Sequence, residues 1–400
     1  MKPALLCACL LASSLSVADA EEFLDEVDQA LTFSAFDDQV RARVSGLLDL
    51  EYYNYPQPPP GLIRAEGHDL FTPRLSIFLD GKIGPAVYVF AQTRVDTGFD
   101  PTDLGTEWRL DEYAIRVTPW SDGRFNLQLG KFSAVVGGWV ARHLSWDNPF
   151  INAPLPYENA TLVSDLELPF TGQSFRRVPG FDKYEFLPII WGPAYTLGAS
   201  VAGRIGIFEY AAEVKNAAVS SRPETWDDLD FSHPSVDLRL GLQPSQAWRF
   251  GFSAAEGPYL LPNAQPSPPG GAGDYRQFVL GQDLSWARGH LQIWLEVFQA
   301  RFEVPRLGNA NMLAYYLEAK YQFTPQLFGA LRWNQEFFVT DDDPAGQPVA
   351  RAHDVWRIDA ALGYRFSAHT QLKLQYSVAR GDFVSNSKHG TFAAQFTVRF

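Results

Sequence analysis

The last ten residues of the chain, Thr391–Phe400, alternate strictly between apolar and polar side chains. One face carries Phe392, Ala394, Phe396, Val398 and Phe400, and the other carries Ala393, Gln395, Thr397 and Arg399. A period of two residues is typical of a β-strand with one apolar face. A tilted strand of about ten residues is long enough to cross a bilayer as part of a closed barrel.

The same alternation recurs from residue 39 to the C-terminus. It predicts sixteen strands: Val40–Tyr53, Phe71–Ile83, Ala86–Asp96, Trp108–Thr118, Arg124–Val135, Ala194–Ala202, Ile207–Lys215, Ser235–Gln243, Trp248–Ala255, Tyr275–Trp286, Leu291–Ala300, Met312–Phe323, Leu327–Val339, Trp356–Phe366, Gln371–Ala379 and Thr391–Phe400. The sequence is 46% hydrophobic and 14% aromatic, yet its mean hydropathy is only −0.15. This combination fits strands in which every second residue faces lipid, and no apolar run after residue 20 is long enough for a membrane helix.

The connections between these strands fall into two classes. Every second junction is a tight turn built on Gly, Pro, Ser or Asp, as hairpins require. The others are longer and cover residues 54–68, 97–107, 136–193, 216–234, 256–274, 301–311, 340–355 and 380–390. Short turns at one end and long loops at the other are typical of a transmembrane barrel with periplasmic turns. We therefore predict an all-β, antiparallel up-and-down transmembrane barrel over residues 39–400, in preference to a soluble all-β protein.

Residues 1–20 have the pattern of a secretory signal peptide. Lys2 precedes an apolar stretch, and Ala18-Asp19-Ala20 forms a small-residue cleavage site. Both cysteines, Cys7 and Cys9, lie in this stretch. We therefore expect an exported mature chain without disulfides or cysteine-based metal sites.

Residues 21–38 form an acidic segment with seven acidic residues and no basic ones. Its apolar residues fall near helical spacing, so a short helix is expected. Two interpretations stay open. The segment is either a solvated periplasmic extension or a piece that enters the barrel and pairs with arginines in the lumen.

Charged residues opposite the apolar faces would line the lumen of the barrel. The lumen-lining candidates are Arg41, Arg43, Arg74, Arg94, Arg116, Arg239, Arg249, Arg332, Arg357, Arg365, Glu112, Glu296, Glu318, Glu336 and Asp359. Unpaired buried ions cost several kcal/mol each, so these charges require water or close pairing. Sixteen strands enclose enough space for an aqueous channel. Counted over all residues expected to face inward, sixteen bases stand against thirteen acids, and this small excess would favour anionic solutes. Alternatively, the charges pair across strands, as the spacing of Glu318 and Lys320 suggests.

The long third connection, residues 136–193, is the best candidate for a functional element. A loop of this length in a compact protein is usually functional or disordered, and its many aromatic and aliphatic residues argue against disorder. The candidates for a pore constriction are Arg142, His143, Asp147, Glu158, Arg176 and Arg177. The alternative is that the same residues cap the barrel from outside.

Catalytic and metal-binding signals are weak. His143, Ser145 and Asp147 contain the residue types of a catalytic triad, but neighbours in one loop do not form its geometry. The seven histidines lack metal-ligand spacing, and Asp341-Asp342-Asp343 is better explained as a solvated loop tip than as a calcium site. We therefore predict no enzyme activity, catalytic residue, metal or cofactor. The net charge of −13 argues against nucleic acid as a partner.

Two features resemble a known family. An amphipathic last strand that ends in Phe400 is similar to the assembly signal of Gram-negative outer-membrane barrels. Sixteen strands with a long third extracellular loop resemble the bacterial porins, in which that loop folds inward. The resemblance covers most of the chain through topology, and the Pro-Glu-Phe-Gly-Gly signature of the general porins is absent.

This resemblance implies an outer-membrane location, with the lipid bilayer as partner. It also implies a water-filled channel for passive diffusion of small hydrophilic solutes, narrowed by residues 136–193, and it includes a homotrimer among the possible assemblies. The alternative is a plugged or scaffold barrel that serves a partner complex or an export machine.

Overall fold

The computed structural model describes residues 17–55, 68–97, 105–169, 186–222, 231, 234–339, 341–342, 346, 348–349, 354–381 and 388–400. Within these residues, the barrel strands are β2 (Val40–Asn54), β3 (Asp69–Ile83), β4 (Val87–Asp96), β5 (Glu107–Val117), β6 (Asn126–Phe132), β7 (Thr196–Ile205), β8 (Phe208–Lys215), β9 (Ser235–Leu242), β10 (Trp248–Pro258), β11 (Arg276–Arg288), β12 (Leu291–Val304), β13 (Gly308–Gln322), β14 (Leu327–Phe338), β17 (Val355–Arg365), β18 (Thr370–Arg380) and β19 (Lys388–Arg399). The smaller elements are α2 (Val17–Ala30), β1 (Thr32–Ala35), β15 (Asp341–Asp342), β16 (Pro348–Val349), and the 3₁₀ turns η1 (Val140–Arg142), η2 (Leu155–Tyr157) and η5 (Ala272–Asp274).

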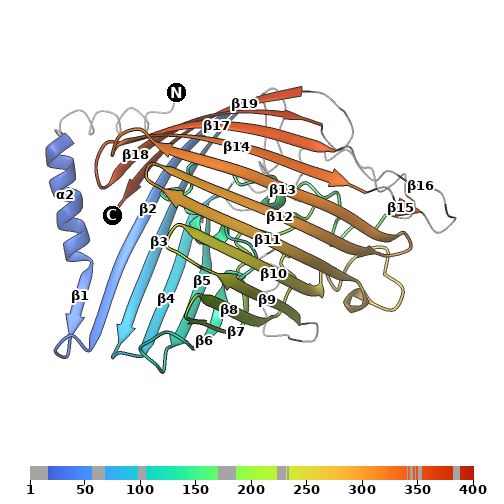
Figure 1. Ribbon diagram of the computed structural model, residues 1–400, viewed down its shortest axis with the longest axis horizontal. Helices are drawn as coiled ribbons and strands as arrows, with labels where there is room; N and C mark the ends of the chain where they lie inside the picture. The colour runs from blue at the N-terminus through green and yellow to red at the C-terminus, as the bar shows by residue number, and fades with distance from the viewer. Residues whose placement is uncertain are drawn as a thin grey trace.

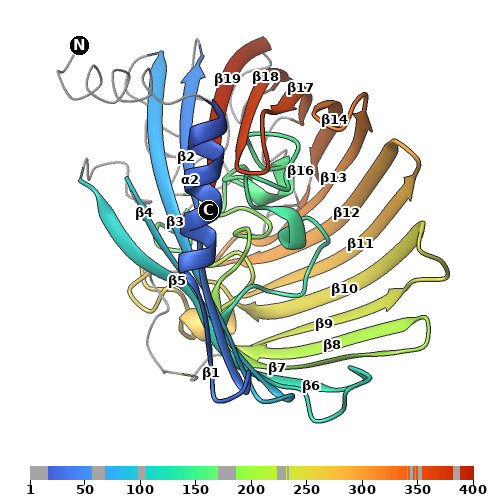
Figure 2. The ribbon, with the colours of Figure 1, turned by 90° about the vertical axis from the view of Figure 1, so that its left-hand side faces the viewer.

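The sheet closes on itself. Each barrel strand pairs antiparallel with the next, and the last strand β19 pairs with the first barrel strand β2, from Phe392 opposite Asn54 to Arg399 opposite Leu47. Figure 1 shows the strands side by side, and Figure 2 shows the ring that they form. The predicted antiparallel up-and-down barrel of sixteen strands is thus confirmed. Among the described residues, no helix is both long and apolar enough to cross a bilayer.

One predicted loop is wrong in length. The sequence pattern placed a long connection at residues 301–311, but β12 runs to Val304 and β13 begins at Gly308. The ladder continues through Phe302 opposite Ala310, and both residues are buried. Burial of these side chains against the barrel interior extends the two strands past the point where the alternation is visible in the sequence.

The two faces of the strands differ as the alternation predicts. In β17, Ile358 and Leu362 are exposed on the outside, while Arg357 and Asp359, which flank Ile358, are buried inside. The extra residue of a β-bulge interrupts the alternation in β5, where the register with β4 shifts between Gln92 and Thr93.

This bulge changes which face the residues of β5 occupy. Trp108 and Tyr113 are five residues apart, yet both are exposed, whereas Asp111 is buried. A regular strand would place two residues at this odd spacing on opposite faces.

The seam between the first and last barrel strands ends at the C-terminal residue. The amide of Phe400 donates to the Gly46 carbonyl at 3.1 Å, and the Gly46 amide donates to the Phe400 carbonyl at 2.8 Å. Two residues earlier along β2, the Val44 amide donates to the Leu31 carbonyl at 3.0 Å. The short strand β1 therefore takes over beside β2 where β19 stops.

The acidic segment forms helix α2 and strand β1 at the end of the barrel where the tight turns lie. Asp28 of α2 bonds to Arg43 of β2 at 2.7 Å, and Asp25 bonds to His369, in the turn between β17 and β18, at 2.9 Å. Figure 2 shows α2 in front of β2 and β19. The helix begins at Val17, and residues 1–16 of the predicted signal peptide lie outside the described residues.

The largest buried apolar cluster lies inside the barrel. It combines residues of the connection between β6 and β7, such as Val136, Leu155 and Ile190, with inward residues of β11 and β12, such as Val279 and Phe298. The interior is therefore filled in part by the chain itself. This packing brings the predicted functional loop against the charged wall.

Candidate functional site

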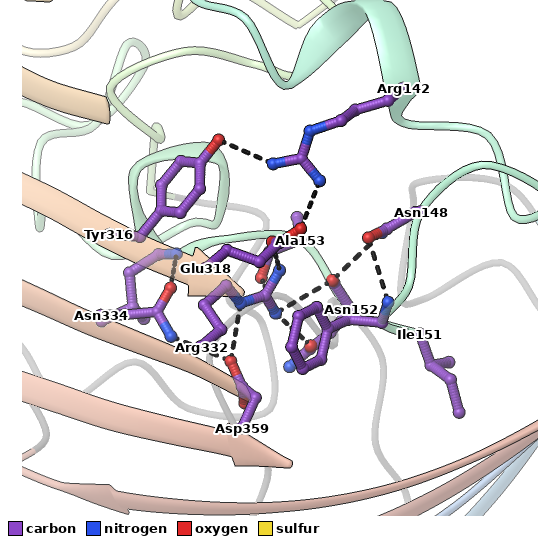
Figure 3. A network of polar contacts seen from close by, with 12 residues as sticks. Arg142, Asn148, Ile151, Asn152, Ala153, Tyr316, Glu318, Arg332, Asn334 and Asp359 are labelled. Atoms are coloured by element: carbon purple, nitrogen blue, oxygen red, sulfur yellow. Dashed lines mark hydrogen bonds and ion pairs between the residues drawn. The ribbon is translucent and has the colours of Figure 1, made fainter. Parts of the chain in front are cut away.

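Residues 133–169, which follow β6 and which we call the inner loop, lie inside the barrel. The backbone turns twice, at η1 and η2, and each turn presents side chains to the surrounding strands. Figure 3 shows Arg142 reaching from η1 toward Tyr316 and Glu318 of β13, and Asn152 beside Arg332 of β14. The candidate site is this loop together with the wall that it contacts.

Arg142 joins the start of the inner loop to β13. Its guanidinium bonds to the Glu318 carboxylate at 2.5 Å and to the Tyr316 hydroxyl at 3.1 Å, and it lies 4.3 Å from the centre of the Trp294 ring. Glu318 is fully buried, so the pair has little solvent around it. A buried carboxylate requires such a partner, because an unpaired ion in the interior is costly.

A second group of ion pairs lies between η2 and strands β14 and β17. Arg357 contacts Glu158 of the inner loop at 2.6 Å and Asp359 at 2.9 Å, and Arg332 also contacts Asp359 at 2.9 Å. All four residues are almost completely buried. Burial raises the pKa of Glu158, and the positive charge of Arg357 opposes that rise.

The backbone of the inner loop completes this network. The Ala153 carbonyl accepts from Arg332 at 3.1 Å and from Arg357 at 2.6 Å, and the Asn152 side-chain oxygen accepts from Arg332 at 2.6 Å. Two arginines thus bind both the wall and the loop. The loop is held by charge-assisted hydrogen bonds, which are the stronger class.

Lys373 of β18 is held by backbone carbonyls of the inner loop. Its ammonium group donates to the carbonyls of Ser145, Asn148 and Phe150 at 2.7, 3.0 and 3.1 Å. Three donors therefore meet three acceptors, which satisfies the buried amine. The same stretch is held from the side by Gln375, whose oxygen accepts from the Ile151 amide at 2.7 Å.

A glycine allows the loop to approach β12. Gly137 has a φ of +81°, and a side-chain carbon added there would lie 2.2 Å from the Tyr157 hydroxyl oxygen. That hydroxyl donates to Glu296 at 2.5 Å, and the Gly138 amide donates to the same carboxylate at 2.7 Å. Burial raises the pKa of Tyr157 well above its usual value, so the phenol stays protonated as a donor.

The predicted constriction residues are placed in different surroundings. Arg142 and Glu158 bind the wall, as described above, and Asp147 is exposed. Arg176 and Arg177 lie outside the described residues.

His143 is enclosed by the loop and the wall. Its Nδ1 lies 2.6 Å from the Val140 carbonyl, and its Nε2 lies 3.1 Å from the Tyr195 hydroxyl. Burial lowers the pKa of His143 to about 4, so the ring is neutral at neutral pH.

Most lumen-lining candidates have identified partners. The pairs outside the groups described above are Arg41 with Asp38, Arg43 with Asp28, Arg74 with Asp49 and Glu51, Arg94 with Asp111, Arg239 with Asp283, Arg249 with Glu209, Arg116 with Gln128, Arg365 with Gln371, and Glu112 with the Ser133 amide. The suggested pairing of Glu318 with Lys320 is wrong, because Glu318 contacts Arg142 and Arg332 while Lys320 lies over the Phe328 ring at 4.4 Å.

Glu336 of β14 is the exception among these candidates. It is fully buried, and neither carboxylate oxygen has a hydrogen-bond partner among the described residues. No group of three metal-ligating side chains occurs in the described part of the chain, so Glu336 is not part of a metal cluster there.

The charged wall has two zones. Around the inner loop, charges such as Arg332, Arg357 and Asp359 are buried and paired. Toward the tight turns, Arg43 and Arg249 keep about half of their side-chain surface exposed. An open hollow of about 300 Å³ lies in this second zone and includes Arg239 in its lining. Basic side chains near the turns therefore remain accessible to solutes.

Sequence reasoning did not find the residues that hold the loop. Alternation in β18 indicates that Lys373 faces inward, but its three carbonyl partners are backbone atoms, which leave no signal in the sequence. The amides of Asn152 and Asn334 were also missed. Alternation indicates that Asn334 faces inward, but it does not show that the Leu155 amide donates to it at 3.3 Å.

Comparison with known proteins identifies structures of similar fold. No protein-family profile matches the sequence, and no curated protein sequence matches it. Several solved structures, however, are similar to the structure of this chain. An anion-selective porin from Comamonas acidovorans has a TM-score of 0.57 at 11% identity, over 90% of this chain and 100% of that chain.

Two further structures are similar to the same degree. OmpF of Salmonella typhi, in a complex with daunomycin, has a TM-score of 0.58 at 10% identity, over 92% of this chain and 100% of that chain. The trimer form of OmpT, an outer membrane protein of Vibrio cholerae, has a TM-score of 0.56 at 8% identity, over 91% and 100%. The chain is therefore a porin-like barrel in its fold.

Proposed function

We propose that the protein is an outer-membrane channel of a Gram-negative bacterium for the passive diffusion of small hydrophilic solutes, narrowed by residues 136–193. One observation carries this proposal. Inside a closed barrel with a charged wall, the inner loop is bonded to that wall by Arg142, Arg357 and Lys373. Such bonds hold a loop across a lumen at a defined position, which is what a constriction requires.

The exposed bases near the tight turns support a preference for anionic solutes. Arg43, Arg116 and Arg249 lie on inner faces and are exposed, and Arg204 and Arg239 line the open hollow. Rings of basic side chains favour anions in pores. Acidic partners reduce this effect, since Asp28 pairs with Arg43 and Glu209 pairs with Arg249. Reversal potentials measured across a salt gradient show directly whether the channel prefers anions or cations.

The arrangement around Ser145 supports the proposal that the protein is not a hydrolase. The Ser145 side chain is buried. Both nitrogens of His143 face other groups, the Val140 carbonyl and the Tyr195 hydroxyl, so His143 has no nitrogen directed at Ser145. A serine nucleophile needs that contact.

Single-channel recording in planar bilayers tests the channel. The wild type is expected to give small, stable conductance steps. Arg142→Gln removes the bond to Glu318 and is expected to increase the conductance or its noise, because the inner loop gains freedom. Arg276→Gln is the matched control, since Arg276 pairs with Glu256 at 2.9 Å, while its neighbour Gln277 is the buried residue that faces the interior. The proposal would be overturned if neither the wild type nor Arg142→Gln gave any conductance.

A plugged barrel is a second candidate, because the largest apolar cluster lies in the interior. A dry, apolar plug would block water and ions, and a barrel of this kind would serve a partner complex or an export machine. Replacement of residues 139–191 by a short Gly-Ser linker separates the two functions. A silent wild type with a conducting deletion would favour the plugged barrel, whereas conductance in both would favour the channel.

The assembly that we propose is a homotrimer embedded in the lipid bilayer. The trimer form of the similar OmpT structure supports it by fold alone. Light scattering of the detergent-solubilised protein tests it, because three copies and one copy differ threefold in protein mass.

A further inference from the structure

Helix α2 spans the end of the barrel where the tight turns and the C-terminus lie. It connects through β1 to the edge of β2, and its Asp25 reaches the turn between β17 and β18. Figure 1 shows α2 standing apart from the strand ends on that side, and Figure 2 shows it in front of the opening beside β2 and β19. Among the residues of α2 whose side chains are described, each is either exposed or half-buried.

The contacts of α2 are to the inner side of the rim. Arg43, which binds Asp28, lies on the same face of β2 as the lumen-facing residues Asp49 and Glu51. Arg399 lies 4.4 Å from the ring of Trp146 in the inner loop, and the charge of Asp28 acts on it as well. The acidic helix therefore lies beside basic side chains at this mouth of the barrel.

The contact between Asp25 and His369 depends on the protonation of the imidazole. His369 Nε2 lies 2.9 Å from the Asp25 carboxylate, and His369 Nδ1 lies 2.7 Å from the Arg399 carbonyl oxygen. A carbonyl oxygen and an ionised carboxylate only accept hydrogen bonds. Both bonds form together only when both ring nitrogens carry a proton, which is the imidazolium form.

The surroundings of His369 contain charges of both signs. Asp25 and Asp28 approach from α2, Arg43 belongs to β2, and Arg399 of β19 donates to the neighbouring Ala368 carbonyl at 3.0 Å. Arg365 of β17 and Asp147 of the inner loop act on Arg399. Deprotonation of His369 leaves one ring proton for two acceptors, so the Asp25 carboxylate and the Arg399 carbonyl compete for it and the ionic attraction to Asp25 is lost. The ion pair between Asp28 and Arg43 then remains.

We propose that α2 is an acid-closed lid on the turn-side mouth of the barrel, held down by Asp25 on protonated His369 and by Asp28 on Arg43. The proposal rests on the channel function proposed above. Because the two bonds of His369 require the imidazolium form and acid favours that form, the lid closes as the medium acidifies. Arg43 and Asp25 are exposed, although His369 is buried, and pairs with an exposed partner are weak and screened by salt. The lid is therefore easily released at neutral pH and at high ionic strength.

A spin label on α2 tests the latch without any need for conductance. Glu22 is exposed, so Glu22→Cys carries a nitroxide, and it is the only cysteine of the expected mature chain because Cys7 and Cys9 lie in the predicted signal peptide. Between pH 7.5 and pH 5.0, the ratio of mobile to immobilised label is expected to fall by roughly two- to fivefold, which is the range for one exposed ion pair. His369→Gln and Asp25→Asn are expected to abolish this shift. Glu26→Gln, which neutralises another exposed acid of the same helix, is expected to keep it.

A charged replacement separates the latch from a merely structural role of the turn. His369→Arg carries its charge at both pH values, so the label is expected to be immobilised at both. A spectrum of the wild type that does not change with pH, or a change that persists in His369→Gln, would overturn the proposal.

Conductance of the same variants tests the gate. The wild type is expected to conduct less at pH 5.0 than at pH 7.5, and His369→Gln is expected to lose this difference. Equal conductance at both pH values, together with a label that responds, would overturn the lid as a gate while the channel stands. If no variant conducts at either pH, the channel function is overturned instead. The mobility of the spin label then still tests whether Asp25 and His369 hold the helix.

Discussion

Arg357 and Glu158 are 199 residues apart in the chain, and their side chains meet at 2.6 Å in the interior of the barrel. One belongs to the wall and the other to the inner loop, and each is at most 2% exposed. This contact places the loop and the wall in one buried ionic network. The network explains why the lumen-facing charges are tolerated in a region with little solvent.

Removal of Arg357 is expected to destabilise the protein strongly. Arg357→Met leaves Glu158 buried without its cation, and breaking a buried pair in this way costs about 3–5 kcal/mol. Urea unfolding in detergent, followed by tryptophan fluorescence, measures the loss. Arg357→Met combined with Glu158→Gln is expected to recover part of it, because the orphaned carboxylate is then absent. Arg249→Gln serves as control and is expected to cost less than about 1 kcal/mol, since its pair with Glu209 is half exposed; equal losses would contradict the argument.

Acid is expected to loosen the inner loop through His143. Burial lowers the pKa of His143 from 6.5 to about 4, so between these values the unfolded chain binds a proton that the folded loop does not. The stabilisation is complete above about pH 6.5 and is lost as the pH falls toward 4, by roughly 3 kcal/mol in total. Hydrogen exchange of residues 139–148 at pH 7.0 and pH 4.5, corrected for the intrinsic rates, measures this opening. His143→Phe keeps an aromatic ring and is expected to lose the acid response; an unchanged response in this variant would show that another group is responsible.

Replacement of Glu336 is expected to stabilise the barrel. Its carboxylate is fully buried without a hydrogen-bond partner among the described residues, and burial of an unpartnered polar group is unfavourable. Glu336→Met removes that cost and is expected to raise the free energy of unfolding by about 1–3 kcal/mol.

Asn334, two residues earlier on the same face of β14, provides the contrast. Its side chain donates to Asp359 at 2.9 Å and accepts from the Leu155 amide. Asn334→Leu is therefore expected to lower the free energy of unfolding by about 1–3 kcal/mol. A loss of stability in Glu336→Met would mean that Glu336 contributes favourably in the folded state.

The seam between β2 and β19 is expected to depend on Gly46. A side-chain carbon at this position would lie 2.3 Å from the ring of Phe400, so Gly46→Val must displace that ring. The expected cost is about 1–3 kcal/mol, which is typical of overpacking. The loss is expected to be non-additive with Phe400→Ala, because both changes remove the same contact. The temperature at which the folded band disappears on unheated gels measures the stability of all three variants, and full additivity would contradict the contact.

The sequence predicted much of the architecture because a strand records its environment locally. In β17, Arg357 and Asp359 alternate with Ile358 and Leu362, and each side chain reports which face it occupies. Sixteen such segments joined by short turns at one end form one sheet, and this sheet has no unpaired edge strands only if it closes into a barrel. The bulge in β5 and the extension of β12 escaped prediction, since both depend on pairing with a neighbouring strand.

The candidate site was only partly predictable. Residues 136–193 could be recognised as unusual, and Arg142 and Glu158 could be chosen as charged residues within them, but nothing local identifies Glu318 and Arg357 as their partners. The cage around Lys373 consists of backbone carbonyls, which every residue has. Alternation determined by itself that this chain forms a barrel with an apolar outside and a charged inside. The tertiary structure alone decided that part of this inside is filled by the inner loop, because contacts between residues far apart in the chain depend on where the backbone brings them.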